Sequence, residues 1–280
     1  MTIKDLLVQV DQTPAAQQRL DAALSLGKHF GAQVTALDLM AEPFLRGVTG
    51  YHLPAEVVRE HLHHAEAEAD GVLAAARTAA ERHGVALDTH REAGPLDRLP
   101  ALFARIARNA DLVIVGEPNP DESGSDEAVL VETAFMDTGR PALVVPHLGA
   151  RVMPPRRVLV AWNGSREAAR AVHDALPLLR AAEDVIVLIV DADRQGVRFG
   201  PQPGAGLLAH LARHEVTARV KAVDSGGAAT GTTILAQADA ESVDLVVMGG
   251  YSHSRLRQMM LGGTTRTLLE RMSLPILFSH

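Results

Sequence analysis

A glycine-rich segment near the end of the chain contains the residue types that bind a phosphate group. It follows the apolar run at 245–248. Glycine lets the backbone approach a ligand closely, and the first turn of a helix offers free N–H groups to an anion. Three arginines accompany the segment, and no acidic residue lies between Gly249 and Thr267. The candidate ligands are Gly249, Ser252, His253, Gly262, Gly263, Thr264 and Thr265.

The chain is an internal duplication. Residues 110–147 and 243–280 share one plan, in which an apolar run stops at a glycine and a proline precedes the closing apolar run. The starts of the two halves also match, and the short linker between them contains Pro154 and a second proline. A repeat of this length has the size of a domain. We therefore expect two domains, 1–148 and 155–280, each large enough for its own core.

The first half carries the opposite charge at the position of the phosphate segment. Seven acidic residues and no basic residue lie in 117–137. A triphosphate brought there would be repelled rather than neutralised. We therefore expect one nucleotide per chain, bound by the second half, and a structural or vestigial role for Asp11 in the first.

Apolar runs alternate with helical patterns along both halves, which predicts an α/β fold: two tandem doubly wound domains, each a parallel sheet flanked by helices. In such sheets ligands bind beyond the carboxyl ends of the strands, where the strand order reverses. The second half has the shorter middle helix. The expected strands are 6–10, 33–39, 86–92, 112–115 and 142–145, then 158–162, 185–190, 217–223, 245–248 and 276–278, with the long first-half helix at 55–83.

Composition excludes several classes of function. The chain has no cysteine, a net charge of −7 and 3% aromatic residues, which argues against thiol chemistry and nucleic-acid binding. No apolar run approaches the ~18 residues of a membrane helix. The first residues lead directly into a strand, so we expect no signal peptide and a cytoplasmic protein. Neither a P-loop nor a strand-linked GxGxxG is present.

The segment that opens this subsection resembles the nucleotide-binding motif of the universal stress protein family, which is glycine, two residues, glycine, nine residues, glycine, then serine or threonine. Here Gly249 is followed after two residues by Ser252 and, nine residues later, by Gly262 and Gly263. The spacing matches, but serine replaces the second glycine and glycine replaces the hydroxyl residue. The family's aspartate after the first strand is matched by Asp11, whereas the second half has asparagine.

The resemblance covers nearly the whole chain twice, so the protein resembles a tandem universal stress protein. It implies a five-stranded parallel sheet in each half, of the adenine nucleotide α-hydrolase-like type. It also implies an ATP or AMP site, with or without Mg²⁺, formed by the loops after the first and fourth strands. By family analogy Asn163 would lie in that site, and the backbone near Val190 would contact adenine.

Simpler interpretations stand beside these. The segment 249–265 could be a structural turn, and Asn163 could belong to a turn as well as to a ligand site. Thr13 and Ser165 are more readily explained as helix caps than as ligands. The histidines at 61–64 could bind a metal, but a solvated helix face explains them more simply.

We expect a cytoplasmic universal stress protein that binds ATP or AMP in its C-terminal domain and acts as a stress-response regulator or sensor. The alternative is a nucleotide-free scaffold of the same fold. A third interpretation is a sensor for a ligand that is not a nucleotide, with 196–204 as its lid. No nucleophile, base and acid form a set, so we expect no enzyme, although slow ATP hydrolysis stays open.

Asp191 is the nearest candidate for Mg²⁺. The closing strands, 142–145 and 276–278, are candidates for edge-to-edge pairing into an internal pseudo-dimer, and two chains could pair again as a homodimer.

Overall fold

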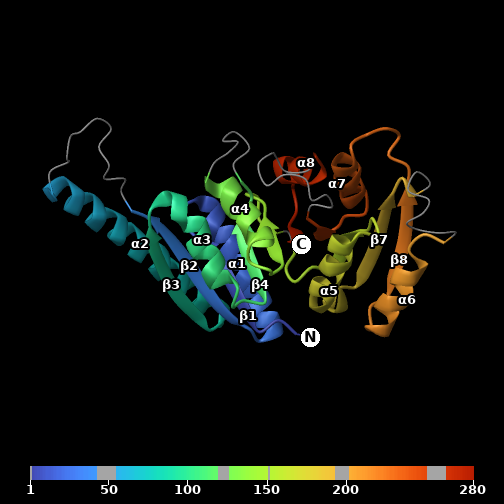
Figure 1. Ribbon diagram of the computed structural model, residues 1–280. Helices are drawn as coiled ribbons and strands as arrows, with labels where there is room; N and C mark the ends of the chain where they lie inside the picture. Colours follow the sequence, from blue (N-terminus) through green and yellow to red (C-terminus); the bar gives the residue numbers. More distant parts are fainter. Residues whose placement is uncertain (1, 43–54, 119–125, 151, 193–201, 251–262) are drawn as a thin grey trace.

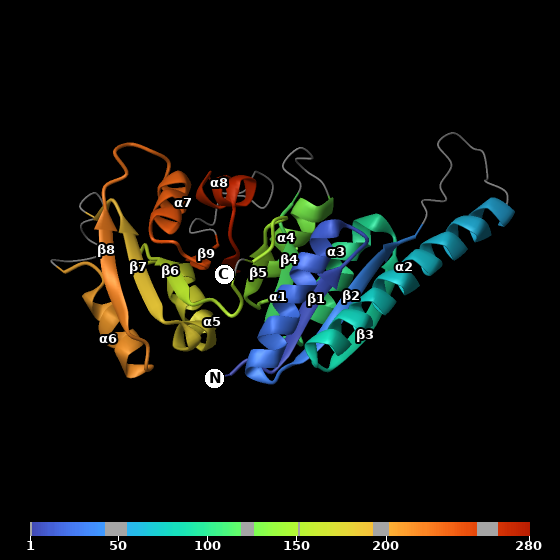
Figure 2. The same ribbon diagram turned by 180° about the vertical axis from the view of Figure 1, so that it is seen from behind.

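The computed structural model describes residues 2–42, 55–118, 126–150, 152–192, 202–250 and 263–280. In these residues a single ten-stranded sheet runs through the molecule in the order β3-β2-β1-β4-β5-β10-β9-β6-β7-β8. The first half, blue to green, and the second half, yellow to red, lie side by side, and the C-terminus lies between them (Figures 1 and 2). Each half contributes five consecutive strands, as the duplication predicts.

The first half alternates strands and helices throughout. Its elements are β1 (Asp5–Val10), α1 (Pro14–Phe30), β2 (Gln33–Ala41), α2 (Ala55–His83), β3 (Leu87–Gly94), the 3-10 turn η1 (Leu96–Arg98), α3 (Leu99–Ala107), β4 (Leu112–Gly116), α4 (Asp126–Met136) and β5 (Ala142–Val145). The long helix α2 occupies the residues that the sequence pattern predicts.

The second half repeats this order with a shorter middle helix. Its elements are β6 (Arg157–Ala161), α5 (Arg166–Ala181), β7 (Asp184–Val190), α6 (Ala205–Arg213), β8 (Ala218–Val223), α7 (Thr230–Ala240), β9 (Leu245–Gly249), α8 (Gly263–Arg271) and β10 (Ile276–Ser279). Helix α6 has 9 residues where α2 has 29, as expected. No helix in the described ranges is both long enough and apolar enough to cross a membrane.

All strand pairs within a half are parallel, and the two halves join through an antiparallel pair. Strand β1 lies between β2 and β4, and β6 lies between β7 and β9, so the strand order reverses at β1 and at β6. At the join, Leu277 of β10 is opposite Leu143 of β5. The expected pairing of the two closing strands is therefore observed. Phe135 of α4 and Phe278 of β10 stack across the join with ring centroids 5.2 Å apart.

The core forms two layers, one on each face of the sheet. Helices α1, α2, α5 and α6 cover one face, and α3, α4, α7 and α8 cover the other. Both layers contain residues of both halves, and the central strand side chains are 0–3% exposed. Strands buried on both faces explain the continuous Val, Ile and Leu runs of the sequence.

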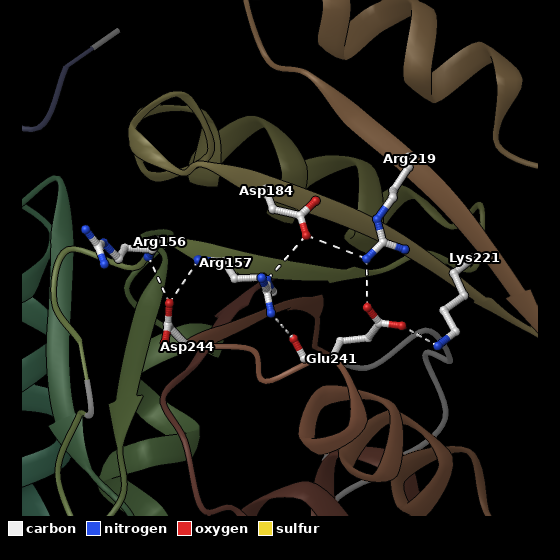
Figure 3. A network of polar contacts seen from close by, with 7 residues as sticks. All are labelled: Arg156, Arg157, Asp184, Arg219, Lys221, Glu241 and Asp244. Carbon is white, nitrogen blue, oxygen red and sulfur yellow. Dashed lines mark hydrogen bonds and ion pairs between the residues drawn. The ribbon is translucent and has the colours of Figure 1, made fainter.

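The amino-terminal ends of the strands carry a matching device in each half. The carboxylate of Asp111 accepts the backbone N–H groups of Lys4 and Asp5 at 2.8 and 3.1 Å. Asp244 accepts those of Arg156 and Arg157 at 3.0 and 2.9 Å (Figure 3). Each aspartate thus fixes the start of the first strand of its half to the start of the fourth. The same geometry twice supports the duplication.

In the second half a wider ionic network surrounds this device (Figure 3). Glu241 accepts from Arg219 at 2.7 Å and from Lys221 at 2.5 Å, and Arg219 also lies 3.6 Å from Asp184. These two basic side chains lower the pKa of Glu241 to about 2. The network lies at the ends of the strands opposite to those that bind ligands, so it belongs to stability rather than to a site.

Candidate nucleotide-binding site

Three predicted site residues lie at the carboxyl ends of neighbouring strands in the second half. Asn163 follows β6, Val190 ends β7 and Gly249 ends β9. Because β6 lies between β9 and β7, these residues share one edge of the sheet at the reversal of strand order. Three further predicted residues, Ser252, His253 and Gly262, lie outside the described residues.

The loop after β6 is held by its own side chains. The Asn163 Oδ1 accepts the N–H of Ser165 at 3.0 Å, which is the geometry of an Asx turn. The Ser165 hydroxyl accepts the N–H of Ala168 at 3.1 Å, so Ser165 caps α5 as expected. No described residue accepts from the side-chain nitrogen of Asn163. Its donors are therefore available to a ligand.

Gly249 packs directly on the first turn of α5. A Cβ atom at this position would lie 2.5 Å from the carbonyl carbon of Glu167 and 2.6 Å from the nitrogen of Ala168. Both are backbone atoms, so only glycine fits here. The glycine that is predicted to approach a phosphate is thus also required by the contact between β9 and α5.

Sequence reasoning missed Glu167, which brings an acid to this edge. Its side chain is buried, and its carboxylate lies 2.5 Å from the Arg166 Nε. Burial alone would raise the pKa of Glu167, but hydrogen bonds from Arg166 and Ser165 lower it below the ordinary value. One sequence signal could have found Glu167. It is the second residue of the helix that follows the first strand of this half, and that position lies beside the loop after the fourth strand.

Helix α8 begins at Gly263, where the predicted hydroxyl residues follow. Gly263 is exposed and Thr264 is half-buried, whereas Thr265 is only 2% exposed. Helix α7 supports this first turn, because a Cβ on Gly231 would lie 3.0 Å from the Thr264 carbonyl oxygen. The side chain of Thr264 is therefore better placed than that of Thr265 to meet a ligand.

In the loop after β7, the Asp191 carboxylate forms hydrogen bonds with another loop of the protein. It accepts the N–H and the hydroxyl of Ser225, both at 2.8 Å. This carboxylate, the nearest candidate for Mg²⁺, is thus engaged in holding two loops together. The Val190 side chain is 8% exposed and packs in the core, so it does not face a ligand.

The equivalent edge of the first half is filled by an ion pair. Arg19 of α1 is 4% exposed, and its Nη2 lies 2.5 Å from the Asp11 Oδ2. Burial alone would raise the pKa of Asp11, but Arg19 and hydrogen bonds from Thr13 and Gln9 lower it. Thr13 occupies the N-cap position of α1 without a capping bond, since its hydroxyl donates to Asp11 instead. The cap expected of Thr13 is therefore wrong, and Asp11 has the structural role expected of it.

Comparison with known proteins identifies the family. The sequence profile described as the universal stress protein family matches residues 2–131 and again residues 154–280. The chain belongs to the universal stress protein family. Its two matches place one such domain in each half, in agreement with the repeated fold. No match was found among curated protein sequences.

Solved structures show the same two-domain arrangement. A universal stress protein from Archaeoglobus fulgidus DSM 4304 superposes with a TM-score of 0.73 at 16% identity, covering 99% of this chain and 96% of that one. A putative universal stress protein from Pseudomonas aeruginosa UCBPP-PA14 gives 0.61 at 13% identity, with 99% and 93% covered. A functionally unknown protein from P. aeruginosa PAO1 gives 0.61 at 13% identity, with 99% and 92% covered. At these identities the likeness concerns the fold.

The histidines of the first universal stress protein domain lie along α2. His63 lies 3.6 Å from Glu66 and His64 lies 3.1 Å from Glu68, all on the exposed face of the helix. In the described part of the chain no group of three or more His, Cys, Asp or Glu is arranged to hold a metal. These histidines therefore have local ionic partners rather than a common centre.

The same domain contains a cavity that the sequence did not predict. Its volume is about 200 Å³, and it lies at the carboxyl ends of β1, β2 and β4, beside α3 and α4. The half that was expected to be vestigial as a ligand site thus has a partly open cavity at the reversal of strand order. Cavities depend on the volumes of side chains from several elements, and a sequence pattern carries no record of that sum.

Proposed function

We propose that the second half binds ATP or AMP at the carboxyl ends of β6, β7 and β9, and that the protein acts as a stress-response regulator or sensor. One observation carries the proposal: Asn163 follows β6, and Val190 and Gly249 end the two neighbouring strands, where the strand order reverses. Open α/β sheets bind ligands at this point. The loop from Gly249 to the start of α8 has the family's motif spacing, which supports a phosphate at that helix.

The predicted site residues that the structure describes would have different roles. The backbone near Val190 would contact adenine, and the side-chain amide of Asn163 would donate to the ribose or the base. Gly263 and Thr264 would offer N–H groups at the start of α8 to the phosphates, where a helix carries a partial positive charge. Mg²⁺ would enter with the phosphates rather than through Asp191, whose carboxylate is already engaged.

Regulation would use the join between the halves, which we propose to be an internal pseudo-dimer. Gly250 follows Gly249 directly, and a Cβ on Gly250 would lie 2.9 Å from the ring of Phe135 in the first half. A nucleotide at the end of β9 would therefore lie one residue from the interface. The expected output is a change in binding partners rather than a reaction product.

Titration with ATP and Mg²⁺ tests the proposal. Purified protein is first examined by mass spectrometry for nucleotide that co-purifies, and then titrated by calorimetry. We expect about one site per chain. A stoichiometry near two would mean that the first half also binds, and no heat at millimolar ATP would favour the nucleotide-free scaffold.

A variant at the start of α8 separates loss of binding from loss of fold. A Cβ at Gly263 meets no atom within 4 Å, so Gly263→Asp and Gly263→Ser both fit. Aspartate in a first helical turn favours the helix but repels phosphate. We expect Gly263→Asp to keep its melting temperature and to lose about tenfold or more in ATP affinity. Gly263→Ser, which restores the hydroxyl of the family motif, should bind at least as well as the parent; equal binding by all three proteins would place the phosphates elsewhere.

A further inference from the structure

The cavity of the first half lies at the position equivalent to the proposed nucleotide site, but its lining is different. It is partly open, it lies at the carboxyl ends of β1, β2 and β4, and α3 and α4 complete its walls. Because it belongs to the other half, an inference about this cavity does not rest on the proposed function.

The volume of the cavity limits the size of its ligand. The cavity has about 200 Å³, whereas sites for drug-sized ligands have roughly 300–1,000 Å³. An apolar cavity of about 150 Å³ is large enough to hold a benzene molecule. The ligand is therefore about the size of a benzene ring with one small substituent.

Most of the lining is apolar. Apolar side chains come from β2, η1, α3, β4 and α4, namely Leu39, Leu96, Leu99, Val115, Leu130 and Val131. Val115 and Val131 are 1% and 2% exposed, whereas Leu96 is 48% exposed although it is a large hydrophobic residue. An exposed leucine beside a cavity gives a ligand an apolar surface to cover. The ligand therefore needs an apolar body.

The Asp11 carboxylate in the wall is fully engaged by the protein. Its Oδ2 accepts from the Arg19 guanidinium and from the Gln9 amide, and its Oδ1 accepts from the N–H and the hydroxyl of Thr13. The ion pair also neutralises Arg19, whose Nη2 lies 2.5 Å from Asp11. The pair therefore offers a ligand neither a net charge nor a free carboxylate oxygen.

The other two carboxylates of the lining also have neighbours in the protein. The Glu117 Oε2 accepts the N–H of His147 at 2.9 Å. Burial raises the pKa of Glu117, and His147, a positive neighbour, offsets part of this effect. Glu127 already takes part in a polar interaction of its own. An anion would be repelled by these carboxylates, and a cation would find each of them engaged, so a neutral ligand fits best.

Arg19 keeps one donor for a ligand. Its Nε donates to the backbone oxygen of Gln9 at 3.1 Å, and its Nη2 donates to Asp11. No described residue accepts from its Nη1, which packs over Gly116 in the lining of the cavity. The Arg19 side chain is 5% exposed, and a donor that is buried needs an acceptor. An oxygen atom of a ligand in the cavity would supply it.

We propose that this cavity binds a small neutral carbonyl compound with an apolar body, with ketones as the simplest class. The carbonyl oxygen accepts from the Arg19 Nη1, and the hydrocarbon body lies against Leu39, Leu99 and Val131. A ketone carbonyl has acceptors only, so it leaves no donor unpaired in an apolar lining. Charged ligands, nucleotides included, are rejected, so the two halves of the chain recognise ligands of different chemistry.

Acetophenone is a suitable probe, because analogues of similar size replace its neutral carbonyl by a charged group. Full-length protein is titrated, with ligand-detected NMR, with acetophenone, with the anion benzoate and with 1-phenylethylamine, which is a cation at neutral pH. We expect saturable binding of acetophenone and at least tenfold weaker binding of both charged analogues. No binding of acetophenone at millimolar concentration, or a charged analogue that binds equally well or more tightly, would overturn the proposal.

Arg19→Lys tests the hydrogen bond to the carbonyl. Lysine keeps a positive charge beside Asp11 but has no Nη1. The hydrocarbon 2-phenylpropene has the shape of acetophenone without its oxygen, so it reports on the apolar contacts alone. We expect Arg19→Lys to weaken acetophenone about tenfold and to change the affinity of 2-phenylpropene less than twofold. Equal losses for both compounds would show that Arg19 shapes the cavity without donating to the ligand, and would overturn the placement of the carbonyl.

Ala41→Trp and Ala101→Trp make a matched pair. Both alanines are exposed, but only Ala41 lines the cavity, on the same face of β2 as Leu39. We expect the tryptophan at 41 to occupy the cavity and to weaken acetophenone at least tenfold, and the tryptophan at 101 to change its affinity less than twofold. Circular dichroism and the melting temperature establish that each variant folds. If Arg19→Lys does not fold, this pair still tests the cavity, and an equal effect of the two tryptophans would place acetophenone elsewhere.

The two halves can be tested independently. Acetophenone titrations are repeated with saturating ATP and with Gly263→Asp. If the sites are separate, the affinity for acetophenone stays the same in every case. Displacement of acetophenone by ATP would overturn its assignment to the first half, whereas loss of ATP binding alone concerns only the second.

Discussion

Gly116 and Gly249 end equivalent strands, yet they face different neighbours. The side chain of Arg19 covers Gly116, whereas the backbone of α5 closes on Gly249. The positions equivalent to Asp11 and Arg19 in the second half hold Asn163 and Ala171, so the ion pair exists in one half only. At the carboxyl end of the fourth strand, the first half therefore has a buried charge pair, and the second half has close backbone packing. A duplicated scaffold thus keeps its strands and changes what lies at their carboxyl ends.

The largest expected effect comes from breaking the ion pair. Arg19→Ala would leave the Asp11 carboxylate without its cation, and removal of one partner of a buried pair costs about 3 kcal/mol in the free energy of unfolding. Urea unfolding of Arg19→Ala, Asp11→Asn and the double variant Asp11→Asn/Arg19→Ala measures this. The double variant reproduces the residues of the second half and should cost less than the sum of the two single losses. Additive losses would mean that the two side chains are not coupled.

The two glycines themselves give the next effect. Gly249→Ala would force a Cβ against the backbone of α5, and such overpacking costs about 1–3 kcal/mol. At Gly116 the obstacle is the Arg19 side chain, whose atoms can move further than a helix backbone. We therefore expect Gly116→Ala to lose less stability than Gly249→Ala in the same urea experiment. The reverse order would show that Arg19 is held as firmly as the backbone.

The smallest effect concerns the amino-terminal ends of the strands, where only the second half has the Glu241 network. Its pKa of about 2 lies below the ordinary value of 4.5, so its contribution to stability is complete above pH 4.5 and is lost as the pH falls toward 2. Glu241→Gln should flatten the decline in the unfolding midpoint across this window. Glu183→Gln is the control, because Glu183 forms an exposed pair with Arg156 at 3.1 Å. If the unfolding midpoint of Glu241→Gln declined with pH as steeply as that of the parent, the Glu241 network would not contribute to the stability of the second half.

Most of the fold could be predicted from the sequence, since it depends on local patterns. The apolar runs, the helix from 55 to 83 and the cap at Ser165 each follow from residues close together in the chain. The pairing of β5 with β10 was also expected, because both strands close a repeat and would otherwise be edges. Helices, strands and their order can thus be predicted where a short local stretch of sequence determines each element.

The site could be predicted only in part, because its chemistry depends on contacts between distant segments. Arg19 lies in α1 between Gln18 and Leu20, and nothing local indicates that it would be buried beside Asp11. Glu167 looks like an ordinary acid in a first helical turn until β9 lies against it. The predicted residues Ser252, His253 and Gly262 lie outside the described part of the chain, so their roles remain predictions.

The join at β5 and β10 holds together two halves that belong to one chain, which fixes their ratio. Phe135 stacks on Phe278, whereas the equivalent positions of the repeat hold Leu268 and Val145, so the interface need not be self-complementary. A dimer of separate chains would come apart on dilution, but two halves on one chain have an effective concentration that does not depend on expression level. Each polypeptide therefore carries the cavity of the first half and the proposed nucleotide site of the second in a fixed one-to-one ratio, at any abundance.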